Sequence, residues 1–140
     1  MGVEKTVIYI CIFGVICLLS MATLYPLFEL QKYDSRYLYT TKAYGFSMLP
    51  TIKSGDLLVV TKKDSPYFNP EPCDILVYIY DENIAVAHRL IAIRGDTYIL
   101  KGDNNDYYDI VPEGRIIGEV VEIIPSDNVI ATYIVESLWG

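Results

Sequence analysis

The feature that most constrains this chain is an uncharged stretch near its N-terminus. No Asp, Glu, Lys, Arg or His occurs between Lys5 and Glu29, an interval of 23 positions rich in Val, Ile, Leu and Phe. A helix of that length is about 34 Å long, enough to cross a hydrocarbon core of roughly 30 Å with a modest tilt. Tyr25 and Phe28 at its far end suit a membrane interface. The sequence therefore predicts a transmembrane anchor in residues 1–30 and a folded domain in residues 31–140.

Two other interpretations of this stretch exist. A cleaved signal peptide would use Lys5 as its charged region, residues 7–19 as its apolar run and Ser20-Met21-Ala22 as its cleavage site. Apolar residues continue beyond Ala22 through Phe28, which favours a retained helix. A buried core helix is disfavoured because the stretch has no polar stripe. The flanking charges are mixed in sign, so they do not fix the orientation of the helix in a membrane.

Charge and cysteine content exclude several classes of function. The formal net charge is −7, with 11 basic and 18 acidic residues, and the basic residues form no cluster. A nucleic-acid partner is therefore not expected, because binding phosphates requires grouped Lys and Arg. Cys11 and Cys17 lie in the apolar stretch and Cys73 lies far away, with no Cys-x-x-Cys or Cys/His cluster. We expect no zinc site, no disulfide framework and no cofactor.

The rest of the chain has the composition of a mainly β domain. From residue 33 onward it is rich in Tyr, Val, Ile and Thr, in short apolar runs separated by Gly, Pro, Asn and Asp. The tail 129–139 is apolar but too short to span a membrane, and the sequence leaves open whether it is a final strand or an interfacial segment. The predicted strands are residues 37–46, 57–62, 74–80, 84–94, 97–101 and 116–124.

Three elements of this domain could supply chemistry. His88 is the single histidine, and one histidine is more often structural than catalytic. Ser47 lies on a predicted turn, where a serine usually bonds its own backbone. The polar segment 101–109 contains Asp103 and Asp109 but lacks the glycine and final glutamate of a calcium-binding loop. Together they offer a nucleophile, a base and an orienting carboxylate, and such triads are defined by geometry rather than by sequence order.

Five boxes occur in order between residues 44 and 109, and together they resemble type I signal peptidases of the archaeal and endoplasmic-reticulum kind. The resemblance implies a mostly β catalytic domain tethered by an N-terminal helix. One departure is Cys73, which stands where the family usually has glycine. The boxes are Ser47-Met48-Leu49-Pro50, Ser54-Gly55-Asp56-Leu57, Asp74-Ile75-Leu76-Val77-Tyr78, His88-Arg89-Leu90-Ile91 and Lys101-Gly102-Asp103-Asn104-Asn105.

The resemblance implies a membrane-bound serine endopeptidase that removes signal peptides from secretory preproteins and cuts after small residues. His88 stands where ordinary bacterial signal peptidases carry a lysine, so the implied base is a histidine. Ser47 would be the nucleophile. Asp109, in an apolar setting where a carboxylate needs a partner, would orient the imidazole. Asp103, in a polar turn, would have a supporting role.

The binding residues follow from the same resemblance. The amide of Ser47 and a neighbour around Gly45 would meet the oxyanion. An extended substrate would add to strand edges near residues 44–46, which include Phe46, and near residues 85–87, where Ala85 and Ala87 leave room for a backbone. Met48 would either contact lipid or fill the core.

The expected location is a single-pass membrane protein with its catalytic domain on the extracytoplasmic or lumenal side. Preprotein signal peptides and membrane lipid are the expected partners, with other subunits of a signal peptidase complex as a further possibility. Two alternatives remain open. One is a catalytically inactive, membrane-anchored β-module that binds preproteins or complex partners. The other is a self-cleaving regulatory serine protein of related fold, although such proteins resemble a serine-lysine arrangement and carry a basic DNA-binding segment that is absent here.

Overall fold

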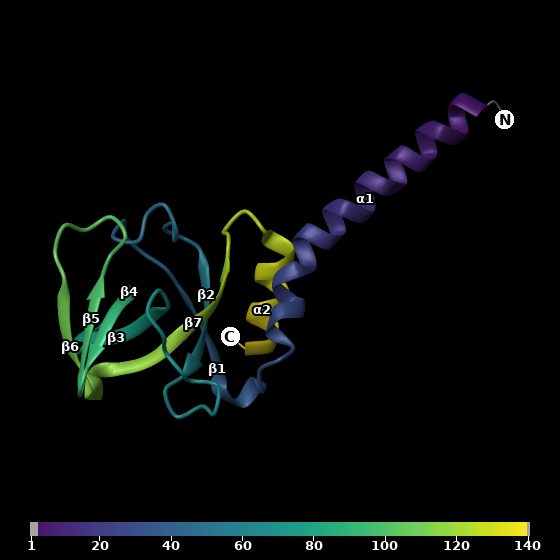
Figure 1. The fold of residues 1–140 in the computed structure, drawn as a ribbon. Coiled ribbons are helices and arrows are strands. Elements are labelled where there is room, and N and C mark those ends of the chain that lie inside the picture. Colours follow the sequence, from purple (N-terminus) through teal and green to yellow (C-terminus); the bar gives the residue numbers. More distant parts are fainter. Residues whose placement is uncertain (1–2, 140) are drawn as a thin grey trace.

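The computed structural model describes residues 3–139 and joins a rolled antiparallel sheet to a long N-terminal helix (Figure 1). The mainly β fold class expected from the sequence is confirmed. The helices are α1 (Val3–Leu30) and α2 (Val129–Trp139), and short 3₁₀ turns occupy Ser35–Tyr37 and Glu113–Arg115. The strands are β1 (Leu38–Lys42), β2 (Leu57–Lys62), β3 (Ile75–Asp81), β4 (Ile84–Arg94), β5 (Thr97–Lys101), β6 (Asp109–Pro112) and β7 (Ile116–Ile124).

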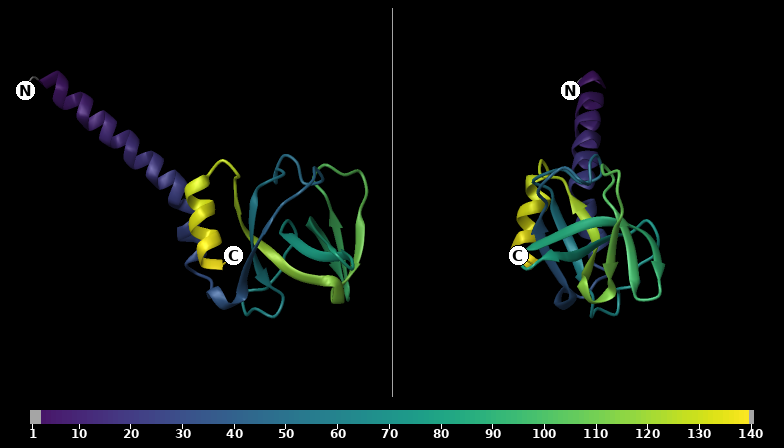
Figure 2. Two further views of the ribbon diagram at one scale, coloured as in Figure 1. Left: turned by 180° about the vertical axis from the view of Figure 1, so that it is seen from behind. Right: turned by 90° about the vertical axis from the view of Figure 1, so that its left-hand side faces the viewer.

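Helix α1 projects away from the β domain for most of its length, as both views of Figure 2 show. Its segment Lys5–Leu30 is long and apolar enough to cross a membrane. The side chains along it, such as Ile10 and Leu18, are exposed although they are apolar. A soluble helix of this kind would hide one face against a core. The exposed apolar surface is therefore the kind that a lipid bilayer covers.

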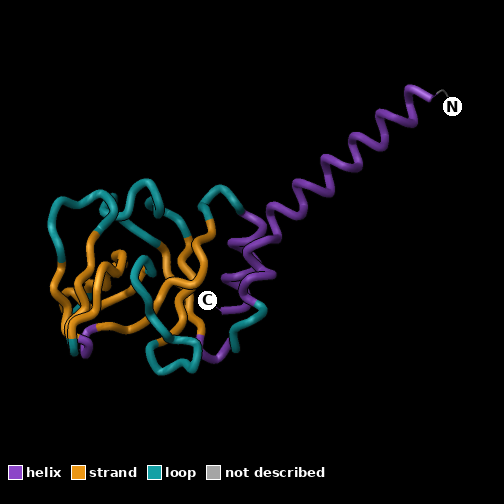
Figure 3. Tube along the Cα trace, viewed as in Figure 1, coloured by secondary structure: helices purple, strands orange, loops and turns teal. Residues whose placement is uncertain are grey.

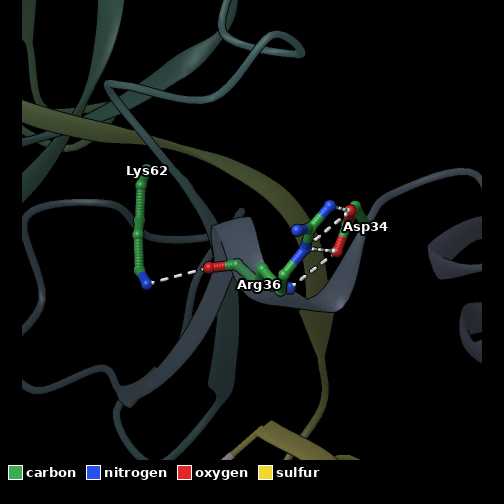
Figure 4. Close-up of polar contacts among 3 residues, drawn as sticks. All are labelled: Asp34, Arg36 and Lys62. Atoms are coloured by element: carbon green, nitrogen blue, oxygen red, sulfur yellow. Dashed lines mark hydrogen bonds and ion pairs between the residues drawn. The ribbon is translucent and has the colours of Figure 1, made fainter.

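The junction between α1 and the sheet is rigidly built. Leu30, the last residue of α1, is buried in a cluster with Leu38 of β1 and Val135 of α2. Asp34 caps the 3₁₀ turn by accepting hydrogen bonds from the backbone and guanidinium of Arg36, which lower the pKa of its carboxyl to about 2. Figure 4 shows that the Arg36 carbonyl also accepts a 3.0 Å hydrogen bond from Lys62 at the end of β2. These contacts fix where the helix leaves the domain.

The sheet has the strand order β1-β2-β7-β3-β4-β5-β6, and all neighbouring strands are antiparallel. Strand β7 pairs with β2 on one side and β3 on the other, and its register shifts at Val121 against β2 and at Ile117 against β3, where the sheet rolls over. An added Cβ at Gly118 would overlap the carbonyl oxygen of Thr61, so only glycine permits this approach. The roll creates the two interior clusters of the β domain: Met48, Ile52, Leu58, Val60, Ile75 and Val77 form one, and Leu76, Tyr78, Leu90, Tyr98, Leu100, Val111 and Ile116 form the other.

Three elements differ from the sequence prediction. The strand expected over residues 37–46 ends at Lys42, because the backbone of Ala43 bonds to Asp56 and Gly45 then turns with φ of +95°. Strand β6 was not predicted, since it is short and ends in proline. The tail 129–139 is a helix, so of the two possibilities that the sequence left open, a final strand or an interfacial segment, the final strand is excluded.

The reason for the helical tail lies in its capping and packing. The Asn128 side chain accepts a hydrogen bond from the backbone N–H of Ala131, which satisfies a donor at the helix start. Ala131 and Val135, four residues apart, are both buried against the end of α1. A helical spacing thus places Ala131 and Val135 on one face, against the end of α1.

Strand β7 also holds a carboxyl group in an unfavourable setting. Glu119 is half-buried, and its Oε2 atom has no hydrogen-bond partner among the described residues. Burial, with the nearby Asp74 and Glu71 carboxylates, raises the pKa of the Glu119 carboxyl from 4.5 to about 7. The folded state thus favours the protonated, neutral form of the Glu119 carboxyl. The resulting stabilisation is complete below pH 4.5 and is lost as the pH rises through about 7.

Replacing Glu119 by glutamine, which stays neutral, should therefore stabilise the protein at pH 8 by about 1–2 kcal/mol and have little effect near pH 4.5. Thermal unfolding of both proteins at the two pH values measures this difference. Glu82→Gln, in an exposed turn, is the matched control and should leave the melting temperature unchanged. An equal gain for Glu119→Gln at both pH values would contradict the explanation.

Candidate active site

Ser47 lies in the loop that joins β1 to β2, at one end of the rolled sheet. Figure 3 shows this loop at the same end of the domain as the loop between β5 and β6. Asn104 joins the loops by two hydrogen bonds: its backbone N–H donates to the Ser47 carbonyl at 2.8 Å, and its side-chain amide donates to the Phe46 carbonyl at 3.2 Å. An added Cβ at Gly102 would lie 2.7 Å from the Ser47 carbonyl oxygen. This close approach requires a glycine.

The strand register brings His88 and Asp109 to one face of the sheet. Leu100 on β5 pairs with Leu90 on β4 and with Asp109 on β6, so these three residues are neighbours across the strands on one face of the sheet. His88 precedes Leu90 by two positions and therefore points to the same face. Asp109 lies at the first position of β6, where its side chain can reach the imidazole.

Ser47, His88 and Asp109 form one hydrogen-bonded row. The Nδ1 atom of His88 lies 2.6 Å from Oδ2 of Asp109, and its Nε2 atom lies 3.0 Å from Oγ of Ser47. Only 4% of the His88 surface is exposed. An ionised carboxylate can only accept, so Nδ1–H donates to Asp109 and leaves Nε2 free to accept the serine proton. The row has the connectivity of a nucleophile, a general base and an orienting group.

Asp103 belongs to a different network. Its two carboxylate oxygens accept hydrogen bonds from Nε and Nη2 of Arg89, both at 2.7 Å, and from the hydroxyl of Thr51. The Arg89 guanidinium lowers the pKa of the Asp103 carboxyl. Arg89 also donates to the Cys73 carbonyl at 2.7 Å. This network links the loop that carries Ser47, strand β4 and the β5–β6 loop. None of its hydrogen bonds involves Ser47, His88 or Asp109.

An open cleft of about 370 Å³ begins at Ser47. The segment Thr41–Gly45 lines one wall and Asn83–Ala87 the other, while Met48 and Val77 are among the apolar side chains that line it between them. Within residues 3–139, β4 pairs with β5 only from Arg89 onward, so Ala85 and Ala87 pair with β3 alone and keep one free backbone edge. An extended peptide can bond to such an edge.

The sequence-predicted binding residues are divided between this cleft and its surroundings. Gly45, Ala85 and Ala87 line the cleft. Met48 also lines it and is buried in the core cluster, which favours the core role over the lipid contact that the sequence left open beside it. Phe46 is 70% exposed and does not line the cleft, although its carbonyl is held by Asn104.

Sequence reasoning did not assign Arg89, Thr51 or Asn104, whose contacts bridge separate segments of the chain. The sequence indicated two of them only indirectly, because Arg89 and Asn104 lie inside two of the five boxes that resemble signal peptidases. The described residues hold no group of three or more His, Cys, Asp or Glu side chains that could bind a metal ion.

A β domain with a serine, a buried imidazole and a carboxylate in one hydrogen-bonded row beside a strand-lined cleft is a serine peptidase in its architecture. The chain belongs to the family described as Peptidase S24-like, whose sequence profile matches residues 21–121. This assignment places it in the superfamily of serine proteases that includes the signal peptidases. A comparison with curated proteins gives no significant match.

Proposed function

We propose that this protein is a signal peptidase of the archaeal and endoplasmic-reticulum Ser-His-Asp subgroup, which removes signal peptides from secretory preproteins. The observation that carries the proposal is the row of Ser47, His88 and Asp109 at the mouth of a cleft with a free strand edge. In this chain a histidine, and not a lysine, contacts the serine hydroxyl. This favours the Ser-His-Asp subgroup.

In the proposed mechanism, the hydroxyl of Ser47 gives its proton to Nε2 of His88 as Oγ attacks the scissile carbonyl carbon. The imidazolium then gives that proton to the leaving amine as the C–N bond breaks, which leaves an ester on Ser47. Water attacks the ester, His88 accepts its proton, and the proton returns to Oγ as the acid product leaves. Asp109 holds the imidazole in the tautomer that every step requires.

The oxyanion donors are proposed to be the amide of Ser47 and a neighbouring amide near Gly45. The Ser47 carbonyl is fixed by its 2.8 Å hydrogen bond from Asn104, and the Phe46 carbonyl is held by the same residue. These bonds orient the peptide planes of the turn before substrate arrives. A donor held in this way is typically worth about 3 kcal/mol in the transition state.

The cleft favours a peptide with small side chains. A substrate strand that bonds to the free edge of β4 meets Ala85 and Ala87, which project little beyond the backbone. The other segment that lines the cleft, Thr41–Gly45, includes the end of β1, an edge strand of the sheet. A chain held between two edges is read at alternate positions, because successive side chains point to opposite faces. This supports cutting after small residues.

We further propose that residues 1–30 anchor the protein in a membrane and that residues 31–140 form the catalytic domain on the extracytoplasmic or lumenal side. The exposed apolar surface of α1 supports the anchor. In Figure 1 the loop between β1 and β2 and the loop between β5 and β6 lie at the top of the domain, and α1 extends upward and away from the domain. That placement favours a substrate delivered at the lipid surface, with other complex subunits as additional partners.

Two alternatives make different demands on the molecule. An inactive binding module has no need for the 2.6 Å and 3.0 Å contacts of His88. A self-cleaving regulator of related fold resembles a serine-lysine arrangement, whereas Nε2 of His88 lies against the Ser47 hydroxyl here. Both observations favour the peptidase.

The test is to purify the full chain from membranes in detergent, confirm by intact mass that α1 is retained, and incubate it with a model preprotein. Mass spectrometry of the products should show one cut after a small residue. The matched substrate, with tryptophan in place of that small residue, should stay uncut. No cleavage by the folded protein, or equal cleavage of both substrates, would refute the proposal.

A further inference from the structure

We propose that Tyr78 is a positioning residue for the reaction, with its hydroxyl held toward the Asp109 carboxylate and its ring packed against His88. The inference rests on the proposed function and extends it. Tyr78 lies in the middle of β3 and ends the box Asp74-Ile75-Leu76-Val77-Tyr78. It has no role in the proposed proton transfers between Ser47 and His88.

The register of the sheet places Tyr78 beside the row. Leu76 pairs with His88 across β3 and β4, and Tyr78 pairs with Val86, two positions before His88. Tyr78 and His88 are therefore diagonal neighbours on one face. Their ring centroids are 6.1 Å apart with an interplanar angle of 61°, an edge-to-face contact. Tyr78 is 3% exposed, so the protein interior holds this arrangement.

In this proposal the hydroxyl of Tyr78 lies against the carboxylate of Asp109. Both residues line a second, smaller cavity of about 220 Å³, which shares no lining residue with the substrate cleft. Burial raises the pKa of the Tyr78 phenol, and the charge of Asp109 and a hydrogen bond to its carboxylate raise it further. The phenol thus stays protonated at the pH of catalysis and acts as a neutral donor rather than a base.

Asp109 is then held by two donors, the Nδ1–H of His88 and the hydroxyl of Tyr78. The second donor disperses part of the carboxylate charge and prevents its rotation away from the imidazole. Removal of that donor leaves the full charge facing His88, which favours the imidazolium over the neutral base. The other titratable or charged groups that face this site are Tyr80, Tyr107, Tyr108 and Arg115 around the second cavity, and Asp103 with its partner Arg89 beyond His88.

The test compares Tyr78→Phe with Tyr98→Phe in the full chain. Tyr98 is a matched control because it is buried in the same cluster, yet it lines neither cavity. Tyr78→Phe should lower kcat about tenfold with KM unchanged, since the lost hydrogen bond involves a charged group. It should also move the acid limb of the pH-rate profile to higher pH. Tyr98→Phe should change neither quantity.

A second measurement needs no substrate. His88 is the only histidine, so histidine labelled with ¹⁵N reports its protonation directly by NMR. The titration midpoint should rise in Tyr78→Phe and stay fixed in Tyr98→Phe. An unchanged midpoint and an unchanged pH profile in Tyr78→Phe, even with lower stability, would reduce Tyr78 to a packing residue. If the unaltered protein cut no preprotein, the proposed function would fail while the NMR comparison still decided the role of Tyr78.

Discussion

Replacing Ser47 by alanine should abolish preprotein cleavage, with a loss in kcat of about 10⁶, as seen when the nucleophile is removed from a serine protease. The change deletes one oxygen atom, which is hydrogen-bonded to Nε2 of His88. The fold depends on other contacts of this loop, chiefly the bond from Asn104 to the Ser47 carbonyl, which alanine retains. Circular dichroism and thermal unfolding should therefore match the unaltered protein.

His88→Gln should cause a loss of similar size, because nucleophile and base act as one unit. Glutamine can keep a donor toward Asp109, so the buried carboxylate is not left without a partner. Two matched controls exist. Ser54→Ala removes an exposed serine hydroxyl from the same loop, and Cys73→Ala removes an exposed thiol, so both should retain activity. A Ser47→Ala protein that cleaved normally, in a preparation free of other peptidases, would remove the basis of the whole assignment.

Local sequence pattern was sufficient for most of the β domain. Short apolar runs between turn residues predicted β2, β4, β5 and β7, whose predicted and observed bounds agree. The end of β1 depends on a bond from Ala43 to Asp56, which no local pattern contains. Helix α2 depends on Ala131 and Val135 finding the end of α1, a contact more than 100 positions away along the chain. These misses arise from tertiary contacts that override local propensity.

The candidate site divides in the same way. Ser47, His88 and Asp109 could be named from ordered motifs, because each lies in or beside a short box. Their mutual distances depend on the register of three strands, and the partners of Asp103 depend on loops far apart in sequence. The sequence placed Tyr78 only in a predicted strand. Its proximity to Asp109 could not be predicted, because the two residues lie on different strands, β3 and β6.

The two aspartates should respond differently to conversion into asparagine. Asp109→Asn should reduce the cleavage rate by roughly 10⁴, the cost of an imidazole held in the wrong tautomer. The amide is nearly the same size as the carboxylate and keeps an oxygen that can face Nδ1, so the melting temperature should change little. Rates measured on the same preprotein, with thermal unfolding of each variant, provide both quantities.

Asp103→Asn should show the opposite balance. Asp103 does not bond the imidazole, and its loss removes a paired charge from Arg89 and an acceptor from Thr51. Hydrogen bonds to charged groups contribute about 1.5–3 kcal/mol each when partly buried, so the melting temperature should fall by several degrees. Activity should fall less than in Asp109→Asn, because Ser47 stays within reach of His88 while its loop loosens. A stable, inactive Asp103→Asn beside an active Asp109→Asn would transfer the orienting role to Asp103 and leave Ser47 and His88 in theirs.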